Sequence, residues 1–189
     1  MPINFDLESI RQKYECVNYF ETGLWDPRDD ISAKLALKSA FNKVYSIEIR
    51  EDFVEMGRDI FRDEILNGRY KLILDDSSNM KKYLNDSIFD EKTIFFLDAH
   101  VDNNNIFNYK YRCPLFEELN AIESLQRKDN IILIDDLRIL TQPFPWGEHS
   151  YGADNFLRLI INKIKDINTD YNFKTLDGFI KDDVLMAYV

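Results

Sequence analysis

Two continuous apolar segments that end in acidic residues constrain this chain more than any other feature of its sequence. Residues 93–98 read Thr-Ile-Phe-Phe-Leu-Asp, and residues 131–136 read Ile-Ile-Leu-Ile-Asp-Asp. Apolar runs of this length without alternation are typical of strands that are buried on both faces, as in a parallel sheet covered by helices. Because ligands bind just beyond the carboxyl ends of such strands, we expect Asp98, Asp135 and Asp136 to meet at a functional site.

Strand and helix patterns alternate along most of the chain. We expect further strands at residues 17–22, 44–49 and 70–74. Helical patterns cover residues 31–41, 52–66, 77–84 and 153–167, and one more helix opens at Pro114. In that last helix the apolar residues share one face, and we expect Glu117 and Glu118 to avoid it.

The C-terminal segment has a different pattern. Residues 171–176 and 184–189 look like strands, and Asp177-Gly178 between them is a strong hairpin signal, although the turn can be longer than two residues. Alternating β and α units followed by a hairpin predict a mostly parallel sheet with one antiparallel strand. We therefore expect residues 1–189 to form a single three-layer α/β domain.

Composition excludes several classes of function. The 189 residues are 45% hydrophobic, which is enough for a core, and the formal net charge of −10 argues against a nucleic-acid partner. No apolar run approaches the ~20 residues of a membrane span, and the N-terminus has no signal-peptide pattern. Cys16 and Cys113 lack metal-ligand spacing, so we expect reduced thiols in a soluble, cytoplasmic protein.

Four short segments resemble the class I S-adenosylmethionine-dependent methyltransferases, and the resemblance extends over residues 17–189. They are residues 20–23 (Phe-Glu-Thr-Gly), residues 44–48 (Val-Tyr-Ser-Ile-Glu), residues 74–77 (Leu-Asp-Asp-Ser) and residues 97–100 (Leu-Asp-Ala-His). That family has a Rossmann-like fold with a seven-stranded sheet whose last two strands form a hairpin. The fold it implies therefore agrees with the one predicted from the strand and helix pattern.

The resemblance also implies cofactor-binding residues. Glu21 and Gly23 correspond to the first strand and the glycine turn beside the cofactor, and Glu48 to the acid that holds the ribose hydroxyls. Asp76 and Ser77 lie in the turn that often contacts adenine, and Asp98 lies at the active-site edge. The chemistry is general, because glycine permits close backbone approach and a carboxylate accepts hydrogen bonds from both ribose hydroxyls.

The acids after the fourth and fifth predicted strands resemble those of the metal-dependent O-methyltransferases, especially the macrocin-type sugar O-methyltransferases. The resemblance implies that Asp98, Asp135 and Asp136 bind Mg²⁺, which prefers hard oxygen ligands. The metal would hold the hydroxyls of a small acceptor such as a sugar and would lower the pKa of the attacking one.

The residue that removes the acceptor proton is left open. Asp98 is one candidate, His100 is a second that is also a potential metal ligand, and His149 is a third.

Other positions near the predicted site have alternative interpretations. Trp25, Phe144 and Trp146 are candidates for an acceptor pocket, and Arg138 either contacts an anionic acceptor or pairs with Glu148. The acceptor would be held by the loop around Asn103, by residues 143–152 or by a partner subunit of a homo-oligomer.

Three alternative functions remain. Residues 23–30 contain one glycine where glycine-loop methyltransferases usually have more, so a binding or scaffolding protein that has lost catalysis is the main alternative. A metal-dependent hydrolase also explains the acids but explains Glu48 and the hairpin poorly. A dehydrogenase is disfavoured because its glycine fingerprint is missing. We also expect Asp135 and Asp136 to be exposed, so that replacing both with alanine leaves folding largely intact.

Overall fold

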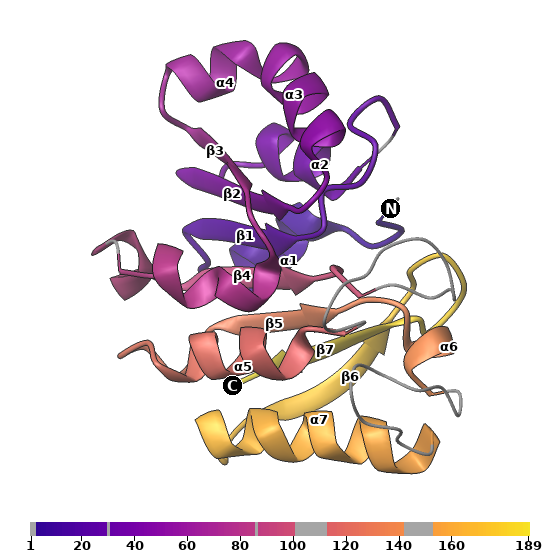
Figure 1. Ribbon diagram of the computed structural model, residues 1–189. Helices are drawn as coiled ribbons and strands as arrows, with labels where there is room; N and C mark the ends of the chain where they lie inside the picture. The colour runs from indigo at the N-terminus through magenta and orange to yellow at the C-terminus, as the bar shows by residue number, and fades with distance from the viewer. Residues whose placement is uncertain (1–2, 30, 86, 101–112, 142–152) are drawn as a thin grey trace.

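The computed structural model describes residues 3–29, 31–85, 87–100, 113–141 and 153–189 (Figure 1). Its strands are β1 (Asn18–Thr22), β2 (Lys43–Glu48), β3 (Tyr70–Leu74), β4 (Thr93–Leu97), β5 (Ile131–Ile134), β6 (Asn172–Leu176) and β7 (Val184–Tyr188). They form one seven-stranded sheet in the order β3-β2-β1-β4-β5-β7-β6. Strands β1 to β5 pair in parallel, whereas β7 is antiparallel to both β5 and β6. The predicted Rossmann-like sheet with a terminal hairpin is confirmed.

The helices also follow the predicted alternation. They are α1 (Leu7–Lys13), α2 (Ser32–Lys38), α3 (Glu51–Ile60), α4 (Arg62–Leu66), α5 (Leu115–Glu123), α6 (Leu137–Leu140) and α7 (Ala153–Ile167), with 3-10 helices η1 (Ser77–Tyr83) and η2 (Ser87–Asp90). The helix expected over residues 52–66 is interrupted at Phe61, whose buried ring packs edge-on against Tyr70. Packing of this side chain against the sheet therefore overrides the local helical pattern.

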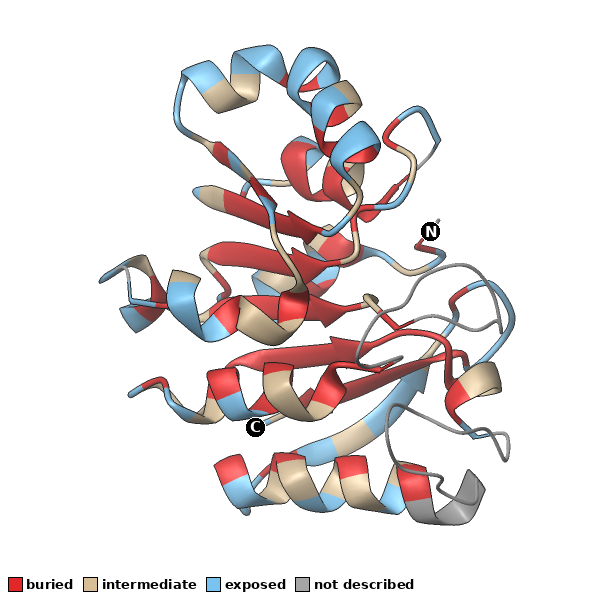
Figure 2. Ribbon diagram, viewed as in Figure 1, coloured by how far each residue is buried: buried red, intermediate tan, exposed pale blue. Residues whose placement is uncertain are grey.

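Two hydrophobic layers cover the sheet, and neighbouring residues of one strand face different layers. On β1, Phe20 belongs to the layer with η1, α5 and α7, whereas Tyr19 belongs to the layer with α1 and α2. On β4, Phe95 belongs to the layer that contains Phe20, and Phe96 belongs to the layer that contains Tyr19. The central strands are therefore buried on both sides (Figure 2), which explains why their sequences are continuously apolar.

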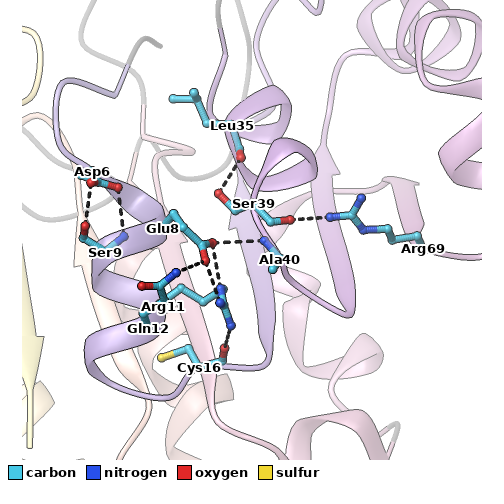
Figure 3. A network of polar contacts seen from close by, with 10 residues as sticks. All are labelled: Asp6, Glu8, Ser9, Arg11, Gln12, Cys16, Leu35, Ser39, Ala40 and Arg69. Atoms are coloured by element: carbon cyan, nitrogen blue, oxygen red, sulfur yellow. Dashed lines mark hydrogen bonds and ion pairs between the residues drawn. The ribbon is translucent and has the colours of Figure 1, made fainter.

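Helix α1 was not predicted from the sequence, although Asp6 caps it by accepting a hydrogen bond from the backbone N–H of Ser9. Figure 3 shows how a second acid attaches this helix to the body of the protein. Glu8 accepts hydrogen bonds from Arg11 and from the backbone N–H of Ala40, just beyond α2. The bond from Arg11 is the main reason that the pKa of Glu8 falls to about 2. The helix is thus held against α2 by polar contacts and by buried apolar residues of the same layer.

The backbones that follow β1 and β4 approach each other closely at Gly23. Gly23 has φ +82°, and a Cβ atom there would lie 2.4 Å from the backbone oxygen of Asp98. The N–H of Gly23 also donates to the backbone oxygen of Ile47 at 2.9 Å, so the turn is fixed from both sides. Only glycine fits this position, both because of its φ and because of the missing side chain.

We predict that Gly23→Ala destabilises the protein much more than Gly68→Ala. Both glycines have positive φ, but at Gly68 the nearest atom to a new Cβ is the flexible Nζ of Lys43 at 3.9 Å. Gly68→Ala should cost about 1–2 kcal/mol from backbone strain alone, and Gly23→Ala more than about 3 kcal/mol because backbone atoms also clash. Urea denaturation of both variants measures the difference, and equal costs would contradict the close approach of β1 and β4.

Candidate functional site

The carboxyl ends of β1, β4 and β5 lie level with one another. Thr22 pairs with Leu97, and Leu97 pairs with Ile134, so the residues that follow these strands are neighbours. The N–H of Asp98 donates to the backbone oxygen of Thr22 at 3.1 Å, and the N–H of Asp135 donates to that of Leu97 at 3.2 Å. The direction of the strand order reverses between β1 and β4, which is where ligands bind in open α/β sheets.

The acids at this edge fall into two groups that share Asp136. Ligand atoms of Asp98, His100 and Asp136 lie within 4.8 Å of one another, as do those of Asp135, Asp136 and Asp183. The three acids proposed as metal ligands are therefore brought to one edge, but Asp98 and Asp135 fall in different groups. Each group has the carboxylate oxygens that hard divalent cations prefer, and the first adds an imidazole nitrogen.

Asp136 has an unusual backbone conformation. Its φ of 63° is left-handed, which is uncommon for a residue other than glycine and which recurs at functional sites. One carboxylate oxygen, Oδ2, lies 3.3 Å from Nε2 of His100, and the other, Oδ1, lies 2.5 Å from Nη1 of Arg138. The carboxylate is thus held between two side chains that are able to carry positive charge.

The expectation that Asp135 and Asp136 are exposed is wrong. They are only 3% and 4% exposed, because the turn between β6 and β7 packs against them. A Cβ atom on Gly178 in that turn would lie 3.1 Å from Oδ1 of Asp135. Replacing both acids with alanine therefore alters buried packing, and it is not a neutral test of function.

The electrostatic state of the edge follows from this burial. Burial, and then the charge of Asp135, raises the pKa of Asp98 well above its usual value. Burial, and then the charge of Asp136, raises the pKa of Asp135 to about 6. Burial also acts to raise the pKa of Asp136, but His100 and Arg138 together outweigh it and the pKa is lowered. The carboxyl groups at this edge therefore hinder one another's ionisation, and a bound cation would relieve that repulsion.

Glu48, at the end of β2, is buried, and both of its carboxylate oxygens accept hydrogen bonds. The N–H of Trp25 donates to Oε2 at 3.0 Å, and the N–H of Arg50 donates to Oε1 at 2.8 Å. Burial raises its pKa, although these backbone donors act in the opposite direction. Each carboxylate oxygen has a second lone pair, so the two ribose hydroxyls expected from the resemblance still have acceptors.

Of the residues considered for an acceptor pocket, the structure describes Trp25. It lies in the single-glycine turn with φ 65°, is 52% exposed, and its ring centroid is 5.9 Å from that of Phe53. The other loop positions considered above, Asn103 and residues 143–152 with Phe144, Trp146, Glu148 and His149, lie outside the described residues. Of these acceptor-pocket candidates, the described residues therefore include Trp25 alone, and its role stays a prediction.

Glu21 lies inside the protein, within a network of hydroxyl groups. Ser32 and Ser46 each donate to its carboxylate at 2.5 Å, and Tyr19 donates at 3.1 Å. Burial is the main reason that its pKa rises to about 6. Glu21 thus joins β1 to β2 and α2, and its carboxylate faces the interior layer that contains Tyr19.

The turn expected beside adenine is tightly organised. Oδ1 of Asp76 accepts the N–H of Ser78 at 2.8 Å and thereby caps η1, while Ser77 is buried. Oδ2 of Asp75 accepts the hydroxyl of Tyr83 at 2.6 Å. These contacts hold Asp76 and Ser77 at the end of β3.

Glu118 was expected to avoid the apolar face of its helix, and this is wrong. It is fully buried on α5, and neither carboxylate oxygen has a hydrogen-bond partner among the described residues. The hydroxyls of Thr22 and Ser77 lie beside it without full hydrogen-bond geometry, and burial raises its pKa to about 7. A glutamate at an inward helical position was the only sequence signal, and it was overlooked because glutamate is rarely buried.

Arg138 and Asp183 form the other arrangement that was not anticipated. Arg138 pairs with both Asp183 and Asp136, whereas Glu148, the partner considered above, lies outside the described residues. Asp183 precedes β7 and is buried, and its backbone oxygen accepts the N–H of Leu137 at 2.8 Å. Nothing local in the sequence indicates this pairing, because 45 residues separate the two partners.

Comparison with known proteins identifies the fold. No protein-family model and no curated protein sequence matches the chain. An O-methyltransferase from Bacillus cereus, solved with SAH, is 15% identical with a TM-score of 0.61, and the match covers 97% of this chain and 78% of that one. TomG from Streptomyces achromogenes, an O-methyltransferase of tomaymycin synthesis solved with SAM, is 14% identical with a TM-score of 0.65, covering 97% and 77%.

A spermidine synthase from Thermotoga maritima also matches, at 11% identity and a TM-score of 0.54 over 90% of this chain and 53% of that one. The chain therefore has the Rossmann-like fold of class I S-adenosylmethionine-dependent methyltransferases, as the resemblance implied. Because a synthase shares this fold, the reaction must be argued from the site. Within the described residues, no helix is long and apolar enough to cross a membrane.

We predict that Glu118→Gln makes the protein more stable at neutral and alkaline pH. The pKa of Glu118 is raised from 4.5 to about 7, so the folded protein retains a proton that the unfolded chain releases. The stability that this group contributes is present below pH 4.5 and is lost as the pH rises to about 7. Relative to wild type, the variant's free energy of unfolding should rise by about 3 kcal/mol between these pH values.

Urea denaturation across this pH range measures the effect. The matched control is Glu117→Gln, because Glu117 is the adjacent glutamate on α5 and is only partly buried. The same pH dependence in both variants would contradict a charge cost that is specific to the buried position.

Proposed function

We propose that the protein is an S-adenosylmethionine-dependent O-methyltransferase that uses a divalent cation, Mg²⁺, to bind a small hydroxylated acceptor. One observation carries this proposal. The glycine turn and Glu48 lie on one side of the β1–β4 switch point, and the group of Asp98, His100 and Asp136 lies on the other. A cofactor site and a cation site on adjacent strands suit transfer between two bound molecules.

The cofactor half is supported by Gly23 and Glu48. Gly23 leaves the turn without a side chain, and the two oxygens of Glu48 face hydrogen-bond donors at the end of β2. We assign Glu48 to the ribose hydroxyls, Asp76 and Ser77 to the adenine side, and Asp98 to the boundary with the acceptor. Glu21 would act indirectly, by holding β1 against β2. The cofactor supplies the methyl group from its sulfonium.

The cation half is supported by the donor set. We assign Asp98 and Asp136, which lie in one group, to Mg²⁺, and Asp135 to the same ion through the second group, which shares Asp136. The bound ion would orient an acceptor hydroxyl and lower its pKa.

We assign the removal of the acceptor proton to His100. Asp136 favours the protonated imidazole, and a bound cation would shift His100 to the neutral form that can take up a proton. His100 is buried next to Asp98, and the contact of its Nε2 with Asp136 fixes the orientation of the imidazole. Burial also excludes water from the transfer path. Asp98 would position the acceptor oxygen between the cofactor and His100.

The charge of the protein supports the acceptor class that we propose. An acidic edge in a chain of net charge −10 disfavours phosphorylated or nucleic-acid acceptors and favours neutral hydroxylated molecules, of which a sugar is the type we propose. Both cysteines are free and buried, in keeping with the reducing cytoplasm that we propose as the location.

A second candidate is a binding protein that uses the same fold without catalysis. The single-glycine turn favours it, because Trp25 occupies a left-handed position next to Glu48 where a second glycine is usual. The two candidates differ in whether S-adenosylhomocysteine and a cation both bind.

We predict micromolar binding of S-adenosylhomocysteine that is weakened at least roughly tenfold in Glu48→Ala, because hydrogen bonds to a carboxylate are lost. Isothermal titration calorimetry with and without Mg²⁺ measures this. The control is Glu51→Ala, which removes an exposed acid at the start of α3 and should bind as wild type does. No binding at millimolar ligand would favour the non-catalytic protein.

We also predict that Asp136→Asn lowers Mg²⁺-dependent methyl transfer to hydroxylated acceptors by about a hundredfold or more, with affinity for S-adenosylhomocysteine nearly unchanged. The measurement is transfer of labelled methyl groups to a panel of sugars and other small alcohols, with and without EDTA. Asp166→Asn on the exposed side of α7 is the control. Full activity in Asp136→Asn, or in EDTA, would remove the cation from the mechanism.

A further inference from the structure

The acid cluster at the end of β5 contains a cation of its own. Nη1 of Arg138 lies 2.5 Å from Oδ1 of Asp136 and also contacts Oδ2 of Asp183. The same nitrogen therefore bridges the two carboxylates, one of which follows β5 while the other precedes β7.

Arg138 is anchored more firmly to Asp183 than to Asp136. Its backbone N–H donates to Oδ1 of Asp183 at 2.9 Å, while its side chain contacts Oδ2 of the same carboxylate. Its contact with Asp136 is an ion pair of the side chain. The guanidinium is thus able to leave Asp136 without leaving Asp183.

Charge explains why a cation is needed at this position. Asp135, Asp136 and Asp183 are all buried, and their ligand atoms lie within 4.8 Å of one another. Buried carboxylates this close repel strongly unless a positive group lies between them. Arg138 is partly exposed, at 23% of its side chain, and its guanidinium carbon lies 5.0 Å from the ring centroid of Phe179 in the β6–β7 turn.

We propose that Arg138 is an internal counter-cation that competes with a divalent metal ion for Asp136, with Asp183 holding the guanidinium when the metal binds. The metal site is the one in the proposed function, and this inference rests on it. Without metal, Arg138 neutralises Asp136; with metal, the ion takes over that oxygen and Arg138 remains on Asp183. Arg138 and Asp183 together thereby set the affinity for the metal, although neither needs to be a ligand.

A double-mutant cycle tests this competition. Isothermal titration calorimetry with Mn²⁺ in place of Mg²⁺ is carried out on wild type, Arg138→Gln, Asp183→Asn and the double variant, at one pH and one salt concentration. Arg127→Gln is the matched control, because Arg127 also pairs with an aspartate, Asp129 at 2.8 Å, outside the cluster.

The two single variants should change affinity in opposite directions. Arg138→Gln should bind Mn²⁺ roughly fivefold more tightly or better, because the competitor is gone. Asp183→Asn should bind it roughly fivefold more weakly, because Arg138 then loses the carboxylate that would hold it away from Asp136. The control should bind as wild type does. Arg138→Gln that binds no more tightly than wild type would overturn the proposal.

The double variant separates competition from simple charge. If Asp183 acts through Arg138, the loss of Mn²⁺ affinity caused by Asp183→Asn should be at least about threefold smaller in the Arg138→Gln background than in wild type. An effect of the same size in both backgrounds would mean that each charge acts on the ion independently, and the proposal would fail.

If Arg138→Gln does not fold, Arg138→Lys replaces it in the cycle. Lysine keeps the charge but loses the planar fork, so it should hold Asp136 less well and Mn²⁺ should bind more tightly than in wild type. Affinity equal to wild type or lower would overturn the proposal. If wild type binds Mn²⁺ and the variants bind it with the same affinity, the competition is refuted but the proposed metal site is not. If neither wild type nor any variant binds Mn²⁺, both the competition and the cation half of the proposed function are refuted.

Discussion

The level ends of β1, β4 and β5 are the constraint on which the rest of the site depends. Parallel pairing of Thr22 with Leu97, and of Leu97 with Ile134, leaves the next residue of each strand in one row. Gly23 makes this alignment sterically feasible, because any side chain there would enter the backbone of Asp98. The same alignment puts the proposed cofactor turn in direct contact with the strand end that begins the acidic edge. The backbone contact that completes the sheet therefore also defines the distance between the two halves of the site.

Buried negative charge is the second physical theme, and it opposes stability. Asp98, Asp135 and Glu118 are carboxyl groups whose pKa values burial raises, so keeping them charged costs folding free energy. Part of this cost is offset at Asp136, whose carboxylate pairs with both His100 and Arg138. Buried acids that are not fully neutralised by positive side chains are expected where a protein binds cations or moves protons. They are less expected in an element that only packs against others.

The sequence predicted the sheet because the physical signal was local. Continuous apolar runs, the regular spacing of helical patterns and the Asp177-Gly178 turn each lie within a few residues, and the structure follows them closely. The meeting of the acids after β4 and β5 also followed, since parallel strands end at the same edge. The burial of Glu118 and the pairing of Asp183 with Arg138 were not predicted, because the residues around each acid lie in other elements and a lone glutamate or aspartate gives no sign of burial. Helix α1 did have a local signal, the cap at Asp6, which the sequence reading missed.

By itself, the sequence determined the layer structure, the strand ends and the residue types available at the functional edge, because periodicity and turn chemistry act over short distances. Tertiary structure alone decided which charges meet there. Only folding brings Arg138 to Asp183 and Asp136, seals Asp135 beneath the β6–β7 turn, and buries Glu118 beside Thr22 and Ser77. The physical reason is that the energy of a carboxylate depends on burial and on the charges around it, and those come from segments that are distant in sequence.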